Sequence, residues 1–231
     1  MTNTMSSSLR KKVSIIVLIP LLITTMFSAI SCGETKAQLP EYKIGNQWVY
    51  KMEYQGLIHD ITIDVTDTDF IDSKECYVTV WNYQPALEGV ITNMSVWIDK
   101  AIIYPIRTQM TGTMMGLPYS AIVNSSYVFH DQEWWPVEVG KEIRISGTKN
   151  RTTKALGLEN KETETKTSTY EVVRMEEVKV LAGTFNCFKI VEHDETGMKL
   201  SETWYSDDVK NDVKYINYEE GYTIELKSFS P

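Results

Sequence analysis

From Tyr42 to its end, the chain is divided into short segments in which apolar and polar residues alternate. Segment Ile58–Val65 (IHDITIDV) is the clearest example, with isoleucine and valine on one face and mainly aspartate and threonine on the other. This alternation is typical of a half-buried antiparallel strand. The nearest helix-like window after the N-terminal segment is Tyr170–Leu181, whose valines favour a strand. The sequence therefore predicts an all-β fold: a curved antiparallel sheet, open or partly rolled into a half-barrel.

Two stretches, residues 40–107 and 136–217, repeat one order of features. Each starts with Pro and Gly, continues to a Cys in an apolar run, then to a Trp just before an Asp, and ends in a strand. The second stretch is longer because it contains the polar segment 148–168, which we expect to be an inserted hairpin or loop. We interpret the pattern as two duplicated β-meander units of one domain, residues 40–231. The alternative is chance recurrence in an all-β chain.

Residues 1–31 predict an export signal with a signal helix. The basic residues 10–12 precede an uncharged apolar run, Val13–Ile30. Ala29-Ile30-Ser31-Cys32 resembles the lipobox of prokaryotic lipoproteins, so we favour a lipoprotein signal with Cys32 as the modified N-terminus. A plain cleaved signal and an uncleaved N-terminal anchor helix stay open. All three interpretations place the later residues outside the cytoplasm, with residues 33–39 as a polar tether.

The predicted exported part is acidic. Three of the 23 basic residues precede residue 33 and all 31 acidic residues follow it, which leaves 31 acidic against 20 basic residues. This balance argues against a nucleic-acid partner and against adsorption to anionic lipid headgroups. We therefore expect attachment to the cell membrane only through the lipid anchor or the N-terminal helix.

If Cys32 carries lipid, Cys76 and Cys187 are the remaining cysteines. Two interpretations compete: a disulfide that joins the two repeats, or two separate buried thiols. The sequence has no CxxC motif and no other Cys or His close to either residue. We therefore predict no metal site and no cofactor.

Methionines and tryptophans are the candidates for a ligand site. Met110, Met114 and Met115 lie in the connection between the repeats. They could form an apolar lip over a hydrophobic ligand, hold a soft metal, or pack at the edge of the core. The abundant aromatic residues could line a concave face or simply build the sheet. The tryptophans expected to line a ligand site are Trp48, Trp81, Trp97, Trp134 and Trp204.

The sequence predicts no enzyme. None of the common catalytic or phosphate-binding motifs occurs, and the histidines are far apart, with His59 expected at the surface. An enzyme would need distant carboxylates to converge in a cleft, for example Asp64, Glu133 and Glu192.

Three short patches resemble motifs of a family of uncharacterised prokaryotic exported lipoproteins and periplasmic proteins. They are Gly45-x-x-Trp48-x-Tyr50, the AGTF-x-C run that ends at Cys187, and Trp204-Tyr205-Ser206. The resemblance implies a half-barrel sheet similar to the LolA-like lipoprotein carriers and brings no catalytic residues. The expected function is a membrane-anchored extracytoplasmic lipoprotein that binds a hydrophobic or lipid-like ligand in its concave sheet. The alternative is a structural or interaction module of the cell envelope without a ligand site.

Overall fold

The computed structural model describes residues 36–230, and every regular element in this part of the chain is a β-strand. Two very short strands, β1 (Lys36–Ala37) and β8 (Val137–Glu138), pair with each other. The first group of longer strands is β2 (Gln47–Tyr54), β3 (Leu57–Ile71), β4 (Lys74–Leu87), β5 (Ile91–Asp99), β6 (Tyr104–Met114) and β7 (Leu117–His130). The second group is β9 (Glu142–Ala155), β10 (Leu158–Val180), β11 (Gly183–Asp194), β12 (Lys199–Ser206), β13 (Asn211–Asn217) and β14 (Tyr222–Ser230).

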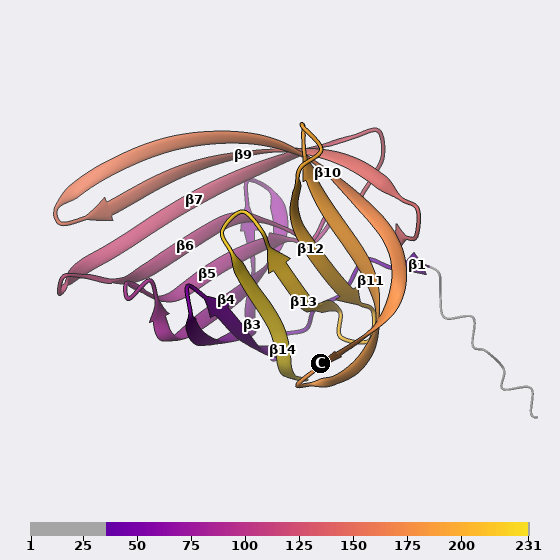
Figure 1. Ribbon diagram of the computed structural model, residues 1–231. Helices are drawn as coiled ribbons and strands as arrows, with labels where there is room; N and C mark the ends of the chain where they lie inside the picture. The colour runs from indigo at the N-terminus through magenta and orange to yellow at the C-terminus, as the bar shows by residue number, and fades with distance from the viewer. Residues whose placement is uncertain (1–35, 231) are drawn as a thin grey trace, which may run out of the picture. The chain divides into compact units, whose positions relative to one another are not determined.

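The twelve longer strands form one closed antiparallel barrel (Figure 1). Neighbouring strands follow one another along the chain, except that β14 pairs with β2 and that β9 pairs with β7, because the short β8 between them pairs with β1 instead. The all-β prediction is confirmed, but the expected half-barrel is wrong. Pairing of β14 with β2 occupies both edges that a half-barrel would leave open.

Tight turns connect most consecutive strands. In four hairpins the turn contains a residue followed by glycine, and both residues have positive φ, which is the geometry of a type I′ turn. The pairs are Gln55-Gly56, Glu88-Gly89, Met115-Gly116 and Leu156-Gly157. Gly112 on β6 meets a different requirement, because a Cβ there would lie 1.8 Å from the carbonyl oxygen of Val90. Only glycine allows β6 to approach the start of β5 so closely.

The strand bounds give the structure of three further segments of the sequence. The polar segment 148–168 is the hairpin of β9 and β10. Segment Tyr170–Leu181 belongs to β10 as far as Val180, so the prediction of a strand there is confirmed. Residues 66–74 belong to the hairpin of β3 and β4: the ladder slips between Val65 and Asp67 and continues to the turn between Ile71 and Lys74.

The predicted tether of residues 33–39 overlaps β1. Ala37 is fully buried in a cluster with Trp134 and Val137, and Lys36 forms a salt bridge of 2.5 Å with Glu138. Lys36 and Ala37 are therefore part of the folded unit. The predicted signal segment and Cys32 lie outside the described residues. Within residues 36–230, no helix is long and apolar enough to cross a membrane.

Cys76 and Cys187 are both buried free thiols, which agrees with the interpretation of two separate buried thiols and not with a disulfide between them. They lie in different clusters of the core and on strands β4 and β11, which are not neighbours. Each Sγ donates to the carbonyl two residues earlier, Lys74 at 3.4 Å and Phe185 at 3.5 Å. Burial raises the pKa of both thiols, to about 12 for Cys187. Both therefore act as small apolar side chains.

Candidate functional site

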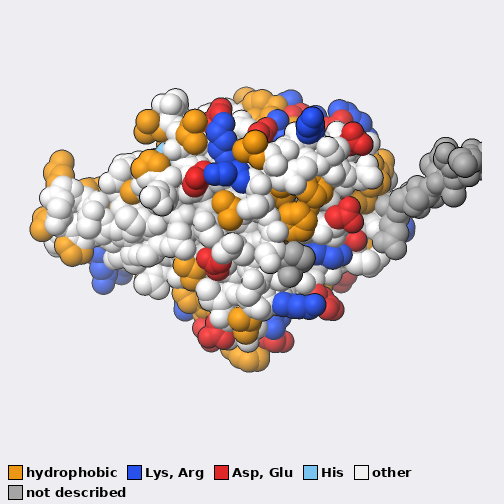
Figure 2. All heavy atoms as spheres, turned by 90° about the horizontal axis from the view of Figure 1, so that it is seen from below, with side chains coloured by type: hydrophobic (Ala, Val, Ile, Leu, Met, Phe, Trp, Pro, Cys, Tyr) orange, Lys and Arg blue, Asp and Glu red, His pale blue; other side chains and the backbone are white. Residues whose placement is uncertain are grey.

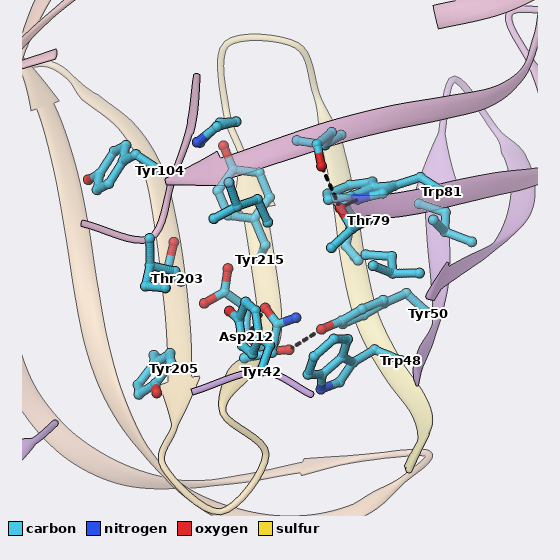
Figure 3. A pocket seen from close by; sticks show the side chains of 18 of the residues that line it. Tyr42, Trp48, Tyr50, Thr79, Trp81, Tyr104, Thr203, Tyr205, Asp212 and Tyr215 are labelled. Atoms are coloured by element: carbon cyan, nitrogen blue, oxygen red, sulfur yellow. Dashed lines mark hydrogen bonds between the residues drawn. The ribbon is translucent and has the colours of Figure 1, made fainter. Parts of the chain in front are cut away.

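A cavity of about 480 Å³ lies within the barrel, and Figure 3 shows many of the side chains that line it. Its volume falls in the range of about 300–1,000 Å³ that is usual for small-molecule sites. Most of the lining side chains are aromatic or aliphatic. They come from strands of both groups and from the segment before β8. The aromatic ones include Tyr42, Trp48, Tyr50, Trp81, Tyr104 and Tyr205.

Strand alternation directs these residues inward. On β2, Trp48 and Tyr50 occupy two of the buried positions and pair directly with Ile63 and Ile61 on β3. All four line the cavity. Because successive side chains of a strand point to opposite faces, the residues between them, Val49 and Thr62, face away from the interior.

Hydrogen bonds fix the orientation of the large aromatic side chains. The indole N–H of Trp48 donates to the carbonyl of Val209 at 3.0 Å, and that of Trp135 donates to Ile102 at 3.1 Å. The Trp81 indole donates to the Thr79 hydroxyl at 3.0 Å. With its polar atom satisfied, each indole can present an apolar ring to the cavity at little cost.

Asp212 is a carboxylate in this largely apolar wall. It lies on β13 directly opposite Tyr205 on β12 and beside Tyr42 (Figure 3). Its backbone carbonyl accepts a hydrogen bond of 2.9 Å from the Tyr50 hydroxyl. Among residues 36–230, none donates a hydrogen bond to its carboxylate or forms a salt bridge with it. Burial raises the pKa of Asp212 from 3.8 to about 7, since the surrounding protein disfavours the charged form.

Of two polar neighbours of Asp212, one lacks a hydrogen-bond partner among the described residues and the other is paired elsewhere. The buried hydroxyl of Tyr205 has no hydrogen-bond partner within the described part of the chain. Lys214 also lines the cavity, but its ammonium group pairs with Glu225 at 2.8 Å. The Asp212 carboxylate and the Tyr205 hydroxyl therefore remain available to a polar group that enters the cavity.

Some of the predicted tryptophans are placed at the cavity and others are not. Trp97 and Trp204 do not line it; their indole N–H groups donate to the carboxylates of Asp69 at 3.0 Å and Glu176 at 2.6 Å. Trp135 lines the cavity and was not predicted. The predicted tryptophans that line it are Trp48, Trp81 and Trp134.

The three predicted methionines do not line this cavity, so that expectation is wrong for it. Met110 and Met114 lie on β6, and Met115 is 90% exposed in the turn before β7. Figure 2 shows hydrophobic side chains at the left end of the view, where the β6–β7 and β9–β10 hairpins end in Figure 1. The exposed apolar residues of these two hairpin tips are Met115, Leu117, Leu156 and Leu158.

The polar candidates from the sequence have separate surroundings. His59, expected at the surface, is 1% exposed, and its Nδ1 lies 2.9 Å from the Pro85 carbonyl, so that expectation is wrong. Asp64 accepts a hydrogen bond from Gln47, whereas Glu192 accepts one from Ser201. Within the described residues, no three His, Cys, Asp or Glu side chains are grouped as metal ligands.

The fold and the cavity define a closed antiparallel barrel with an aromatic interior. The sequence matches no family model and no curated protein. Among solved structures it is similar to one described as a "putative exported protein with YmcC-like fold" from Bacteroides fragilis, with 10% identity, 84% of this chain and 100% of that chain covered, and a TM-score of 0.39. It is also similar to one described as a "putative lipoprotein" from Parabacteroides distasonis, with 13% identity, coverage of 84% and 99%, and a TM-score of 0.37. At these scores the two likenesses carry no argument about this chain.

Proposed function

We propose that this protein is an extracytoplasmic lipoprotein that binds an apolar small molecule inside its barrel. The observation that carries the proposal is the cavity of about 480 Å³ with its aromatic and aliphatic wall. The lipobox-like residues before Cys32 support the attachment to a membrane, and the lipid on Cys32 is part of the proposal.

An apolar ligand is expected to bind because the side chains of the cavity wall lack packing partners when the cavity is empty. Apolar side chains that face a cavity lack the dispersion contacts that they would make in a packed core. An apolar ligand restores these contacts and removes its own surface from water, which contributes roughly 25 cal/mol per Å² of apolar area. Such a wall favours apolar molecules over water.

Binding can be measured with N-phenyl-1-naphthylamine, a neutral apolar dye that fluoresces in apolar surroundings. All described strands lie within residues 36–230, so the chain from residue 33 onward contains the whole barrel. The test variant is Thr108→Trp, which fills the cavity from β6. The matched control is Gln109→Trp, at the exposed neighbouring position of the same strand.

We expect saturable binding of about one dye per chain. Thr108→Trp should weaken it at least about tenfold, and Gln109→Trp should leave it within about twofold, because only the first ring occupies the space for the dye. A chain that folds but binds no dye would contradict the proposal. So would equal binding by the two variants.

One observation favours the alternative of an interaction module, namely the exposed apolar tips of the β6–β7 and β9–β10 hairpins. Exposed apolar patches of this kind occur at protein contacts. This alternative gains support if the folded chain binds no dye and a partner protein is lost after Met115→Ser and Leu158→Ser.

A further inference from the structure

We infer that the ligand of the cavity carries a protonated amine and that the Asp212 carboxylate binds this amine. The inference rests on the proposed function and specifies the chemistry of its ligand: an apolar body with a cationic head. It follows from three features of the cavity, namely the position of the carboxylate, the lack of a cation beside it among residues 36–230, and the aromatic rings around it.

The first feature is the position of Asp212 in the wall. Its strand neighbour across the ladder, Tyr205, lines the same cavity and has a buried hydroxyl without a described partner. A ligand that carries only an apolar surface would leave both groups without hydrogen bonds. Buried polar groups are nearly always paired, so the ligand should carry a donor at this corner.

The second feature is the charge around the carboxylate. The titratable groups that face Asp212 from neighbouring elements are tyrosines and one thiol, and burial raises the pKa of each of them. All are neutral near pH 7. Lys214, two residues along the same strand, is paired with Glu225. The neutral groups are Tyr42, Tyr50, Tyr104, Cys187 and Tyr205.

The third feature is the aromatic surface close to Asp212. Tyr42 and Trp48 pack edge to face with their ring centres 5.2 Å apart, and both line the cavity together with Tyr205. Aromatic faces attract cations through their quadrupole, most strongly where water is excluded. A carboxylate among aromatic rings therefore selects a cationic head, whereas a fatty acid would place a second negative charge beside Asp212.

The experiment compares three ligands with the same twelve-carbon chain: dodecylamine, dodecanol and dodecanoate. Each displaces N-phenyl-1-naphthylamine from the chain that begins at residue 33, below its micelle concentration and at pH 8. We expect the amine to bind about tenfold to a hundredfold tighter than the alcohol, as for a charge-assisted hydrogen bond. The carboxylate should bind most weakly.

The test variant is Asp212→Asn and the matched control is Asp208→Asn, an exposed residue of the turn before β13. Asp212→Asn should bind the amine and the alcohol within about threefold of each other. Asp208→Asn should keep the preference for the amine.

Equal affinities for amine and alcohol in the parent chain would overturn the inference and leave the proposed function intact. If the folded parent chain did not bind the dye at all, the proposed function itself would be overturned.

Discussion

Strands β2–β7 and strands β9–β14 form two halves of the barrel that have β-bulges at equivalent positions. In both groups the ladder slips after a buried valine, Val65 on β3 and Val172 on β10. The carbonyl of each valine accepts a hydrogen bond of 2.8 Å from a glycine N–H, Gly45 in the first group and Gly140 in the second. Both glycines have positive φ. The same turn therefore fixes the same bulge in each half of the barrel.

The correspondence extends to the side chains that follow the bulge. In each half a buried cysteine lies opposite a carboxylate, and this carboxylate accepts an indole N–H from a strand farther along the chain. The two sets are Cys76, Asp69 and Trp97, and Cys187, Glu176 and Trp204. These matches support the interpretation of two duplicated units, which stays a prediction. The units would have six strands each, longer than the stretches 40–107 and 136–217.

The halves differ at the cavity. Ile98 on β5 pairs with Pro105 on β6, and Tyr205 on β12 pairs with Asp212 on β13, with the ladder slip at the same place in both. Asp212 thus stands where the first half has a proline. The shared backbone does not require an acid at this position, and a buried charge without a partner reduces stability. Groups retained at such a cost are typical of functional sites.

The largest change in stability is expected from a substitution of Asp212, the residue at which the two halves differ. Because burial raises the pKa of Asp212 from 3.8 to about 7, the folded state binds the proton more tightly than the unfolded state. The stability that depends on this proton is complete below pH 3.8 and is lost as the pH rises through 7. Asp212→Asn removes the charge and should stabilise the protein by about 4 kcal/mol at pH 8 and by little at pH 4.

Urea unfolding at pH 8 and pH 4 measures this difference. Asp208→Asn in the exposed turn is the control and should change the free energy of unfolding by less than about 0.5 kcal/mol at either pH. An Asp212→Asn gain that is the same at both pH values would show that the charge is not the source of the cost.

The fold was predictable from the sequence in part. Alternation in segments such as Ile58–Val65 was sufficient for the all-β fold, because each strand carries that signal locally. Closure of the barrel was not predictable in this way, since pairing of β14 with β2 joins opposite ends of the described chain. Three of the five predicted tryptophans, Trp48, Trp81 and Trp134, line the cavity, and their contact with a ligand stays a prediction.

Asp212 was missed for a local reason. The bulge at Val213 places Asp212 and Lys214 in register with adjacent residues of β12, so simple alternation along β13 gives the wrong facing residues. Aligning the two repeats through their bulges would have shown that an acid, Asp212, occupies the position that corresponds to Pro105 in the first half. The methionines were chosen by composition, which does not distinguish an exposed hairpin tip from a cavity wall.

A second experiment tests whether the two halves are equivalent in their cores. Val65 is 1% exposed and Val172 is fully buried. Val65→Ala and Val172→Ala should each cost about 2–3 kcal/mol, from the lost methyl groups and the space that they leave. Val128→Ala at an exposed position of β7 is the control. Chemical denaturation measures all three, and markedly unequal losses at Val65 and Val172 would break the correspondence.

A third experiment concerns a carboxylate that is satisfied by its neighbours. Glu202 on β12 lies 3.0 Å from the ammonium groups of Lys189 and Lys199, and it accepts a hydrogen bond of 2.9 Å from Tyr218. Burial alone would raise the pKa of Glu202, but these donors outweigh it and lower the pKa to about 2. This contribution to stability is present above pH 4.5 and is lost as the pH falls through 2.

Glu202→Gln should therefore destabilise the protein by about 2 kcal/mol at pH 7, with a loss that shrinks as the pH falls below 4.5. Its pH dependence is opposite in sign to that of Asp212→Asn. A constant loss across this pH range, measured by thermal unfolding, would mean that packing rather than charge accounts for it.

The smallest expected effect distinguishes the two tryptophans that do not line the cavity. Trp204 donates to Glu176 at 2.6 Å and carries the Lys189 ammonium group 4.8 Å from its ring, so Trp204→Phe should cost about 1 kcal/mol. The corresponding Trp97→Phe should cost less, because its hydrogen bond to Asp69 is exposed to water.

The pKa values of the two carboxylates distinguish the tryptophans more sharply than the stability of the protein does. The Trp204 hydrogen bond is the largest cause of the lowered pKa of Glu176, whereas the Phe70 backbone N–H is the largest cause for Asp69. NMR titration should therefore show a clear rise in the pKa of Glu176 after Trp204→Phe and a smaller rise for Asp69 after Trp97→Phe. Equal rises would mean that the Trp204–Glu176 and Trp97–Asp69 hydrogen bonds are equally strong. The two halves would then differ only at the cavity.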